Sequence, residues 1–331
     1  VPEHHRAIVE LEFDLPRGGV RKAKAWVDTG NQNLSLAKPL ALDLGLDYWS
    51  LAVEGVEVDY TPPEQSVRLG GLPLRVEGVT LRAHPHDLIR PGVSAEVNLP
   101  AAVFRGDHVV FDYAARQITV ARPGVLQPRG VAVPCKVNPE TGLLMIEATI
   151  DGESVPLGID TGSAGTWISE TVAGEWRERH PEWPHATGAA GSANFWGIPF
   201  ESQGILMRLP ELGIGDLVAT DVALLALDQG LFDWYSEKSA APVVGFIGAN
   251  VLKNFRLEID FANGMTYWEA APSTDLPDLD IVGLNLRPEE DGSLVIGAVV
   301  TREGEPVVEG VQAGDKLVRV DDLEVAGSTM G

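Results

Sequence analysis

The sequence predicts a mainly β protein made of two similar lobes, followed by a small C-terminal segment. The tripeptide Asp-Thr-Gly occurs twice, at residues 28–30 and 160–162, each time directly after a short apolar run. Short segments rich in Val, Leu and Ile, separated by turn residues, dominate the chain. Segments with helical periodicity are scarce, so strands and turns are favoured throughout.

An internal repeat supports the two-lobe prediction. Residues 99–113, LPAAVFRGDHVVFDY, align without gaps with residues 247–261, IGANVLKNFRLEIDF. The apolar positions coincide: Leu99 with Ile247, Val103 with Val251, Phe104 with Leu252, Val109 with Leu257, Phe111 with Ile259, and Tyr113 with Phe261. Each copy therefore runs from a DTG to a closing apolar strand. We expect an N-terminal lobe at 1–124, a C-terminal lobe at 125–272, and a linker with a further segment at 273–331.

A hairpin is predicted before each DTG. In residues 143–162, LLMIEATIDGESVPLGIDTG, the pair Asp-Gly stands between alternating apolar residues, a strong hairpin pattern. Residues 7–30, AIVELEFDLPRGGVRKAKAWVDTG, have the same order with Gly-Gly near the turn. Further strands are expected within 72–83 and 212–227, and short helices only at 170–179 and in 248–255.

Composition excludes some functions. The chain has 331 residues and a net charge of -23, which argues against binding nucleic acid, because phosphates require a basic surface. No apolar stretch approaches the roughly 20 residues of a transmembrane helix, and the first residues lack the pattern of a secretory signal. Cys135 is the only cysteine, so no intramolecular disulfide is possible, and we expect it to be a packed apolar side chain.

Two equivalent aspartates can hydrolyse a peptide bond without a metal or a covalent intermediate. One group must take a proton from water while another protonates the carbonyl oxygen. Two carboxylates about 3 Å apart can do both, because they share one proton at the working pH. We therefore predict Asp28 and Asp160 as the catalytic pair, with no metal and no cofactor. Asp112 and Asp260 also recur, but each lies where a strand enters a turn, which predicts a structural role.

The residues after each aspartate have predicted supporting roles. Gly30 and Gly162 allow the backbones to approach closely, where a Cβ would obstruct. The hydroxyls of Thr29 and Thr161 are expected to hydrogen-bond across to the opposite loop. Ser163 is expected to hydrogen-bond the outer oxygen of Asp160, and Asn31 occupies the equivalent place beside Asp28.

With these motifs the chain resembles the pepsin-like and retropepsin-like aspartic proteases, most closely the small bacterial members with both lobes in one polypeptide. The matching segments are DTGNQNLSLA (28–37), GIDTGSAGTWIS (158–169) and GFIGANVLKNFRLEIDF (245–261). The resemblance covers residues 6 to 270. It implies two β-barrel lobes with a cleft between them, a catalytic water held by Asp28 and Asp160, and an extended peptide or protein substrate.

The sequence departs from that family in places. Where the family has two apolar residues and a glycine, the first lobe has Asn98-Leu99-Pro100, which puts the packing behind Asp28 in doubt. Tyr60 is the candidate aromatic residue of a flap over the first lobe. In the second lobe, Phe195 and Trp196 near the tip of a Gly-rich segment are candidates for a substrate wall.

After a Pro- and Asp-rich linker, the tail resembles the start of a PDZ domain. GLNL (283–286) stands where that family binds a carboxylate, and residues 310–325, GVQAGDKLVRVDDLEV, resemble its following turn, strand and hairpin. A groove that adds a peptide strand would suit a protease. The segment is shorter than a whole PDZ domain, so its completeness stays open.

Three functions are compatible with these residues. The first is an aspartic endopeptidase that acts as a monomer through an intramolecular pair of aspartates. The second is a catalytically silent peptide-binding protein, suggested by the Pro100 departure. The third is an enzyme whose pair forms between two chains. The residues leave the compartment open, and the family resemblance favours an extracytoplasmic location, periplasmic or secreted.

Overall fold

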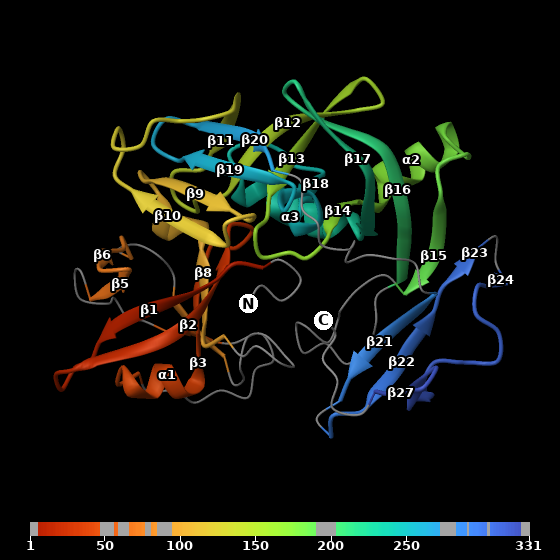
Figure 1. Cartoon of the computed structure of the whole chain (residues 1–331), viewed down its shortest axis with the longest axis horizontal. Coiled ribbons are helices and arrows are strands. Elements are labelled where there is room, and N and C mark those ends of the chain that lie inside the picture. Colours follow the sequence, from red (N-terminus) through yellow and green to blue (C-terminus); the bar gives the residue numbers. More distant parts are fainter. Residues whose placement is uncertain are drawn as a thin grey trace.

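Strands dominate the computed structural model of the chain, which describes residues 6–46, 56–58, 66–76, 81–84, 95–189, 203–271, 283–289, 291–302 and 305–325. The predicted mainly β fold class is confirmed. Two large sheets lie beside each other, and a small group of strands from the C-terminal segment lies at one end (Figure 1). None of the helices in the described part is long and apolar enough to cross a membrane.

The first sheet carries the loop with Asp28. Its strands are ordered β4-β7-β3-β8-β2-β1-β5-β6. They comprise β1 (Ile8–Asp14), β2 (Val20–Asp28), β3 (Leu34–Ala37), β4 (Val56–Val58), β5 (Val67–Leu69), β6 (Leu72–Pro73), β7 (Leu81–His84) and β8 (Val97–Pro100). The predicted β1–β2 hairpin is confirmed, and its turn contains Gly18 and Gly19, both with positive φ. A short helix, α1 (Lys38–Asp43), follows β3.

The second sheet carries the loop with Asp160 and contains a closed barrel. Its order is β10-β9-β19-β20-β11-β12-β13-β18-β14-β17-β16-β15-β23-β24, and a further pairing of β12 with β16 closes the ring β12-β13-β18-β14-β17-β16. The strands not yet placed are β9 (His108–Asp112), β10 (Gln117–Ala121), β11 (Val131–Val137), β12 (Leu144–Ile150), β13 (Glu153–Ile159), β14 (Thr166–Ser169), β15 (His185–Ala189), β16 (Gln203–Ile214), β17 (Leu217–Leu227), β18 (Gly245–Ile247), β19 (Phe255–Asp260), β20 (Met265–Ala270), β23 (Thr301–Arg302) and β24 (Glu305–Pro306).

Local chemistry explains the turns and helices of this sheet. The β12–β13 hairpin turns at Asp151 and Gly152, with φ of 53° and 74°, the backbone form that Asp-Gly favours. Helix α2 (Glu170–Arg179) begins after Ser169, whose side chain accepts a hydrogen bond from the Thr171 N–H. The other helices are η2 (Ala101–Phe104), α3 (Gln229–Lys238) and α4 (Ala249–Leu252). The helices expected at 170–179 and within 248–255 are confirmed, but the expectation of helices only there is wrong, because α1 and α3 are also present.

The same strand order occurs in both sheets. In the first sheet it is β7-β3-β8-β2-β1, and in the second it is β17-β14-β18-β13-β12. The central pair is parallel in each case, β2 with β8 and β13 with β18. Within these pairs Asp28 lies opposite Pro100, and Ile159 lies opposite Ile247. Each DTG loop therefore leaves the end of a strand held in the same local surroundings.

Strands β9 and β19 join the two halves of the chain. They pair antiparallel, with His108 opposite Asp260, Val110 opposite Glu258 and Asp112 opposite Arg256. In the gapless alignment of 99–113 with 247–261, Val110 also corresponds to Glu258 and Asp112 to Asp260. The register is therefore symmetric about the Val110–Glu258 pair. Residues 108–121 lie in the second sheet, although the predicted N-terminal lobe extends to residue 124. The lobe boundary at 124/125 stays a prediction.

The apolar core lies directly behind the two DTG loops. Val27 and Leu99 in the first sheet, and Ile159 and Ile247 in the second, have no exposed surface and belong to one continuous cluster of buried side chains. Burial of large aliphatic side chains contributes about 1.5–3 kcal/mol each. This packing gives the short DTG loops a rigid support.

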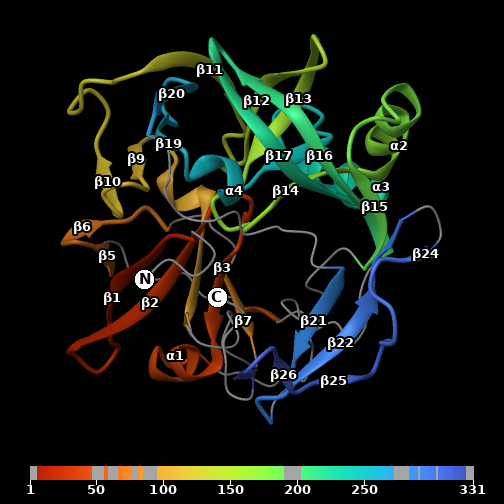
Figure 2. The same ribbon diagram turned by 45° about the vertical axis from the view of Figure 1, so that its right-hand side comes forward.

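The C-terminal strands attach to an edge of the second sheet. β21 (Leu284–Pro288), β22 (Leu294–Val299) and β25 (Lys316–Leu317) form one small sheet, and β26 (Arg319–Val320) pairs with β27 (Leu323–Glu324). β23 lies beside β15 in both ribbon views (Figures 1 and 2), where Thr187 pairs with Thr301. Their hydroxyl groups lie 2.9 Å apart. The resemblance of this segment to a PDZ domain stays a prediction.

A glycine substitution tests the close packing behind the second loop. A Cβ on Gly248 would lie 2.0 Å from the Gly165 carbonyl oxygen, which belongs to the backbone and cannot move aside cheaply. We expect Gly248→Ala to lower the unfolding free energy by about 1–3 kcal/mol or more, through overpacking. Thermal or urea unfolding measures this loss.

Gly174→Ala is the matched control. Gly174 lies inside α2, and a Cβ there meets no atom within 4 Å. The same change should therefore leave stability unchanged or raise it by up to about 1 kcal/mol, through the helix propensity of alanine. Equal losses for the two variants would contradict the packing described for Gly248.

Candidate active site

The structure brings the two DTG motifs of the sequence together. Asp28 is the last residue of β2, and Asp160 directly follows β13. Although both are ionisable, their exposed fractions are only 4% and 6%. Buried carboxyl groups are rare unless they are paired or hydrogen-bonded, so their partners decide what this site can do.

Reciprocal hydrogen bonds between two threonines hold the loops together. Thr29 Oγ1 donates to the carbonyl oxygen of Ile159 at 2.7 Å, and Thr161 Oγ1 donates to that of Val27 at 3.0 Å. Each hydroxyl also accepts from the opposite backbone: Thr161 N lies 3.0 Å from Thr29 Oγ1, and Thr29 N lies 3.3 Å from Thr161 Oγ1. We call this arrangement the threonine pair, and it ties the end of β2 to the end of β13.

The two glycines let the carboxyl groups approach. A Cβ on Gly30 would lie 2.5 Å from Cγ of Asp160, and a Cβ on Gly162 would lie 2.4 Å from Cγ of Asp28. Real side chains do not approach so closely, so only glycine fits at either position. Each glycine therefore packs against the carboxyl group of the opposite loop, which brings the two carboxyl groups close to each other.

Backbone and side-chain donors surround the pair unequally. Asp28 Oδ1 accepts from Gly30 N at 3.1 Å, and its Oδ2 accepts from Asn98 Nδ2 at 2.7 Å. Asp160 Oδ1 accepts from both Gly162 N and Ser163 N, at 2.8 and 3.0 Å. Both carboxyl groups are thus oriented by donors, but the two donors to Asp160 converge on one oxygen.

Burial raises the pKa of both carboxyl groups. For Asp28 the negative charge of Asp160 raises the pKa further, to well above its ordinary value of 3.8, despite the Asn98 hydrogen bond. For Asp160 the effect of burial on the pKa is opposed by the hydrogen bond with Asp28, the Gly162 and Ser163 N–H groups and the Arg6 charge. The pKa of both carboxyl groups is thus raised, and the groups that oppose this rise are more numerous around Asp160 than around Asp28.

Arg6 is a cation next to the site that the sequence did not indicate. Its Nε donates to the carbonyl oxygen of Gly162 at 2.8 Å, and its guanidinium lies 5.6 Å from the ring centroid of Trp26. This position brings a positive charge near Asp160, where it lowers the pKa of that carboxyl group. Arg6 belongs to none of the sequence motifs, since it lies before β1 and far along the chain from Asp160.

The expected role of Ser163 is wrong. Its hydroxyl donates to the carbonyl oxygen of Gly165 at 2.7 Å, and only its backbone N–H contacts Asp160. The hydroxyl is therefore used within its own loop, where it bonds a carbonyl oxygen two residues further along the chain. Asn31, at the equivalent place in the first loop, donates to Asn98 Oδ1 at 2.9 Å.

Asn98 is a site residue that sequence reasoning missed. The sequence marks it only as a departure from an apolar pattern, yet its side chain contacts Asp28. The available indication was a single polar residue between Val97 and Leu99, both fully buried. A polar side chain inside an apolar strand needs a hydrogen-bond partner, which here is the carboxyl group.

Pro100 does not disturb the packing behind Asp28. It is buried and lies opposite Asp28 in the parallel pair of β2 and β8. The next residue, Ala101, donates from its N–H to the Asn31 carbonyl oxygen at 3.1 Å. The second half has the same bond, from Ala249 to Ser163, at 2.8 Å. The proline therefore occupies the position of Gly248 without separating the two loops.

Other candidate residues have simpler outcomes. Asp112 Oδ1 accepts from the Ala115 N–H, and Asp260 accepts from Asn263, so both are turn residues as predicted. Burial raises the pKa of the Cys135 thiol to about 12, which is consistent with a packed, unreactive side chain. The proposed substrate-contacting residues Tyr60, Phe195 and Trp196 lie outside the described residues.

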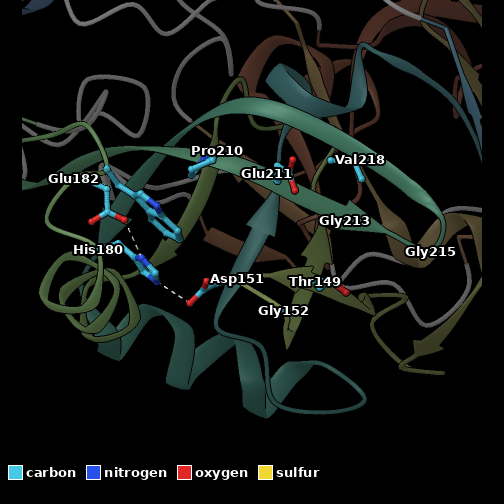
Figure 3. A pocket seen from close by; sticks show the side chains of 11 residues that line it. Thr149, Asp151, Gly152, His180, Glu182, Pro210, Glu211, Gly213, Gly215 and Val218 are labelled. Atoms are coloured by element: carbon cyan, nitrogen blue, oxygen red, sulfur yellow. Dashed lines mark hydrogen bonds and ion pairs between the residues drawn. The ribbon is translucent and has the colours of Figure 1, made fainter.

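A separate pocket of about 590 Å³ lies near the β12–β13 turn, and neither candidate aspartate lines it (Figure 3). His180 lies between Asp151, at 2.7 Å, and Glu182, at 3.2 Å, and its ring stacks on Trp183. The hydrogen bond to Asp151 is the main cause of the raised pKa of His180.

Within the described ranges, no three His, Cys, Asp or Glu side chains are arranged to hold a metal ion.

No protein-family model matches the chain, and no curated protein matches it. Among solved structures, the crystal structure of an aspartic proteinase from Irpex lacteus is similar to 82% of this chain and 95% of its own, with 13% identity and a TM-score of 0.43. A likeness at this level assigns no role to any residue. The interpretation of the site therefore depends on its own geometry.

The threonine pair can be tested by removing a hydroxyl at constant size. Thr29→Val leaves the Ile159 carbonyl oxygen and the Thr161 N–H without a partner in a buried place. We expect a loss of about 2–4 kcal/mol in unfolding free energy, because buried unpaired polar groups cost about 1–3 kcal/mol each. Chemical denaturation measures it, and Thr220→Val on the exposed face of β17 should change stability little.

The raised pKa of Asp28 predicts a pH-dependent stability change. In the folded protein this carboxyl group binds its proton more tightly than in the unfolded chain, so its contribution is fully favourable below pH 3.8 and declines as pH rises toward the folded pKa. Asp28→Asn removes this dependence. The variant should therefore melt at a higher temperature than wild type near neutral pH, and the difference should shrink toward pH 3.

Scanning calorimetry across pH measures the effect. Asp112→Asn is the control, since Asp112 lies in a turn far along the chain and outside the pair. A difference in melting temperature that stays constant from neutral pH to pH 3 would show that Asp28 does not carry the raised pKa.

Proposed function

We propose that the protein is an aspartic endopeptidase that hydrolyses peptide bonds with a water activated between Asp28 and Asp160. One observation carries the proposal: two buried carboxyl groups each lie against the DTG loop that carries the other, because the threonine pair and two glycines hold these loops in contact. Such a pair supplies a base and an acid at the same pH, which is what hydrolysis without a covalent intermediate requires.

The unequal surroundings suggest the role of each aspartate. In the proposed mechanism Asp160 is the ionised partner, and it takes a proton from water as the water oxygen attacks the carbonyl carbon. Asp28 gives its proton to the carbonyl oxygen, which forms a tetrahedral gem-diol. In the second step the C–N bond breaks, the leaving nitrogen takes the proton from Asp160, and Asp28 regains one from a gem-diol hydroxyl. The pair thus returns to its starting state.

The two alternative functions, a silent peptide-binding protein and an enzyme with a pair formed between two chains, have less support than the endopeptidase. A silent peptide-binding protein was suggested by Pro100, but the proline is accommodated behind the loop, and each carboxyl group still lies against the glycine of the opposite loop. A pair formed between two chains is not needed, since both aspartates of the pair come from one polypeptide. A peptide or protein substrate follows from the proposed chemistry, and the peptide-binding role of the C-terminal segment stays a separate prediction.

The endopeptidase proposal predicts that either aspartate is indispensable. Asp28→Asn and Asp160→Asn should each reduce cleavage by at least about 10³-fold, since each leaves the site without an acid or without a base. Mass-spectrometric profiling of a peptide library measures the cleavage. Asp112→Asn should remain active, and substantial activity in either variant of the pair would contradict the proposed roles.

The surroundings also predict a pH profile. The pair is active while it holds one proton, so activity falls at low pH as Asp160 is protonated and at high pH as Asp28 loses its proton. We expect a bell-shaped kcat/KM profile with an optimum on the acid side of neutrality. Arg6 lowers the pKa of Asp160, so Arg6→Met should move the acid limb upward.

Arg6→Lys is the control for this shift. It keeps the positive charge near Asp160 and should move the acid limb less than Arg6→Met does. Equal shifts for the two variants would show that the Gly162 contact of Arg6, and not its charge, affects the pair.

A further inference from the structure

Asn98 contacts Asp28 of the candidate catalytic pair, and this contact has no counterpart in the second sheet, although the same strand order occurs there. Its Nδ2 lies 2.7 Å from Asp28 Oδ2, and the residue is only 4% exposed. The corresponding residue beside the second loop, on β18, is Phe246, a buried apolar side chain. The amide is therefore a feature of the first half alone.

The orientation of the Asn98 amide is determined by its neighbours. Asn31 Nδ2 donates to Asn98 Oδ1 at 2.9 Å and to the Asn33 carbonyl oxygen at 2.8 Å. Asn33 N in turn donates to Asn31 Oδ1 at 3.1 Å. Because Asn98 Oδ1 is occupied as an acceptor, its NH₂ group faces Asp28, and the amide can only donate to the carboxyl group.

The two oxygens of Asp28 have different positions. A Cβ on Gly162 would lie 2.5 Å from Oδ1, so Oδ1 is the oxygen that faces the opposite loop. Oδ2, which accepts from Asn98, is the outer oxygen. Both oxygens accept an N–H bond, Oδ1 from Gly30 at 3.1 Å and Oδ2 from Asn98 at 2.7 Å. The oxygen with the shorter bond is the poorer place for a proton, because protonation weakens the bond that it accepts.

We propose that Asn98 is a positioning residue that keeps the outer oxygen of Asp28 as an acceptor and so holds the shared proton on the inner oxygen, between the two carboxyl groups. This inference depends on the endopeptidase function proposed above and refines it. Asn98 acts through Asp28 and takes no proton itself. Asn31 holds the amide in the productive orientation.

Other groups near the pair set the background for this effect. The charge of Arg6 acts on Asp160, and Asp160 acts on Asp28. The charge of Asp160 also reaches two tyrosines, Tyr113 and Tyr235, but burial of their hydroxyls raises the pKa of each, so both stay neutral over the working range. Asn98 is thus the side-chain donor that opposes the effect of burial on Asp28.

The first test compares the activity of two leucine variants. Asn98→Leu should move the basic limb of the kcat/KM profile upward by about one pH unit, because a hydrogen bond to a charged group lowers the pKa of the carboxyl group that accepts it. Its kcat should fall by about tenfold or more, with a smaller change in KM. Asn98→Asp, which keeps the shape and loses the donor, should shift the limb in the same direction.

Asn250→Leu is the matched control. The Asn250 amide contacts Thr166 Oγ1 and the Ala223 carbonyl oxygen, and the residue lies in α4 of the second half. Its loss should lower the melting temperature and leave both limbs of the profile in place. A basic limb that stays at the wild-type pH in Asn98→Leu would overturn the proposal.

A second test needs no activity. The ¹³C NMR shift of the Asp28 carboxyl carbon is followed across pH in two proteins, Asp160→Asn and the double variant Asp160→Asn/Asn98→Leu. The pKa of Asp28 should be higher in the double variant, and equal values would overturn the positioning role. Failure of the wild-type protein to cleave peptides would instead overturn the endopeptidase function. The NMR titration would still report whether Asn98 lowers the pKa of Asp28.

If Asn98→Leu does not fold, Asn31→Ala gives the same information. It leaves the Asn98 amide in place but removes the bond that orients it. The pKa of Asp28 should then rise by a smaller amount than expected for Asn98→Leu. An unchanged Asp28 titration in this folded variant would contradict the role given to the amide.

Discussion

The reciprocal hydrogen bonds of Thr29 and Thr161 are the constraint on which the rest of the site depends. Two buried carboxyl groups repel each other and lose hydration, which costs several kcal/mol per charge unless protein groups compensate. The threonine pair makes four hydrogen bonds between the loops, so they cannot separate without leaving buried groups unpaired. The fold therefore keeps together two carboxyl groups that would otherwise move apart, and their burial raises the pKa of both.

The frame around the pair is nearly symmetric, whereas its electrostatics are not. The same strand order supports both loops, and the β9–β19 register is symmetric about one residue pair. The donors differ: Asp160 has two backbone N–H groups and a nearby arginine, while Asp28 has one N–H and the Asn98 amide. A symmetric frame brings the carboxyl groups together, and unequal donors and charges surround the two groups.

Much of the architecture could be predicted, because its causes are local. The Asp151-Gly152 turn, the hairpins before each DTG and the helix at 170–179 follow from turn chemistry and apolar periodicity. The recurrence of the DTG motif also indicated which aspartates would meet. By contrast, the role expected for the Ser163 hydroxyl was wrong, because the hydroxyl donates to the Gly165 carbonyl oxygen of its own loop.

The sequence by itself determined the strands, the turns and the identity of the two aspartates, since each depends on residues close together in the chain. Only the tertiary structure decided that Asn98 donates to Asp28 across 70 positions and that the threonines bond across 132. It also decided that β9 pairs with β19 and that Thr301 attaches to β15. These contacts depend on strand register and on which loops the packed core brings together, and neither is encoded in any short stretch of residues.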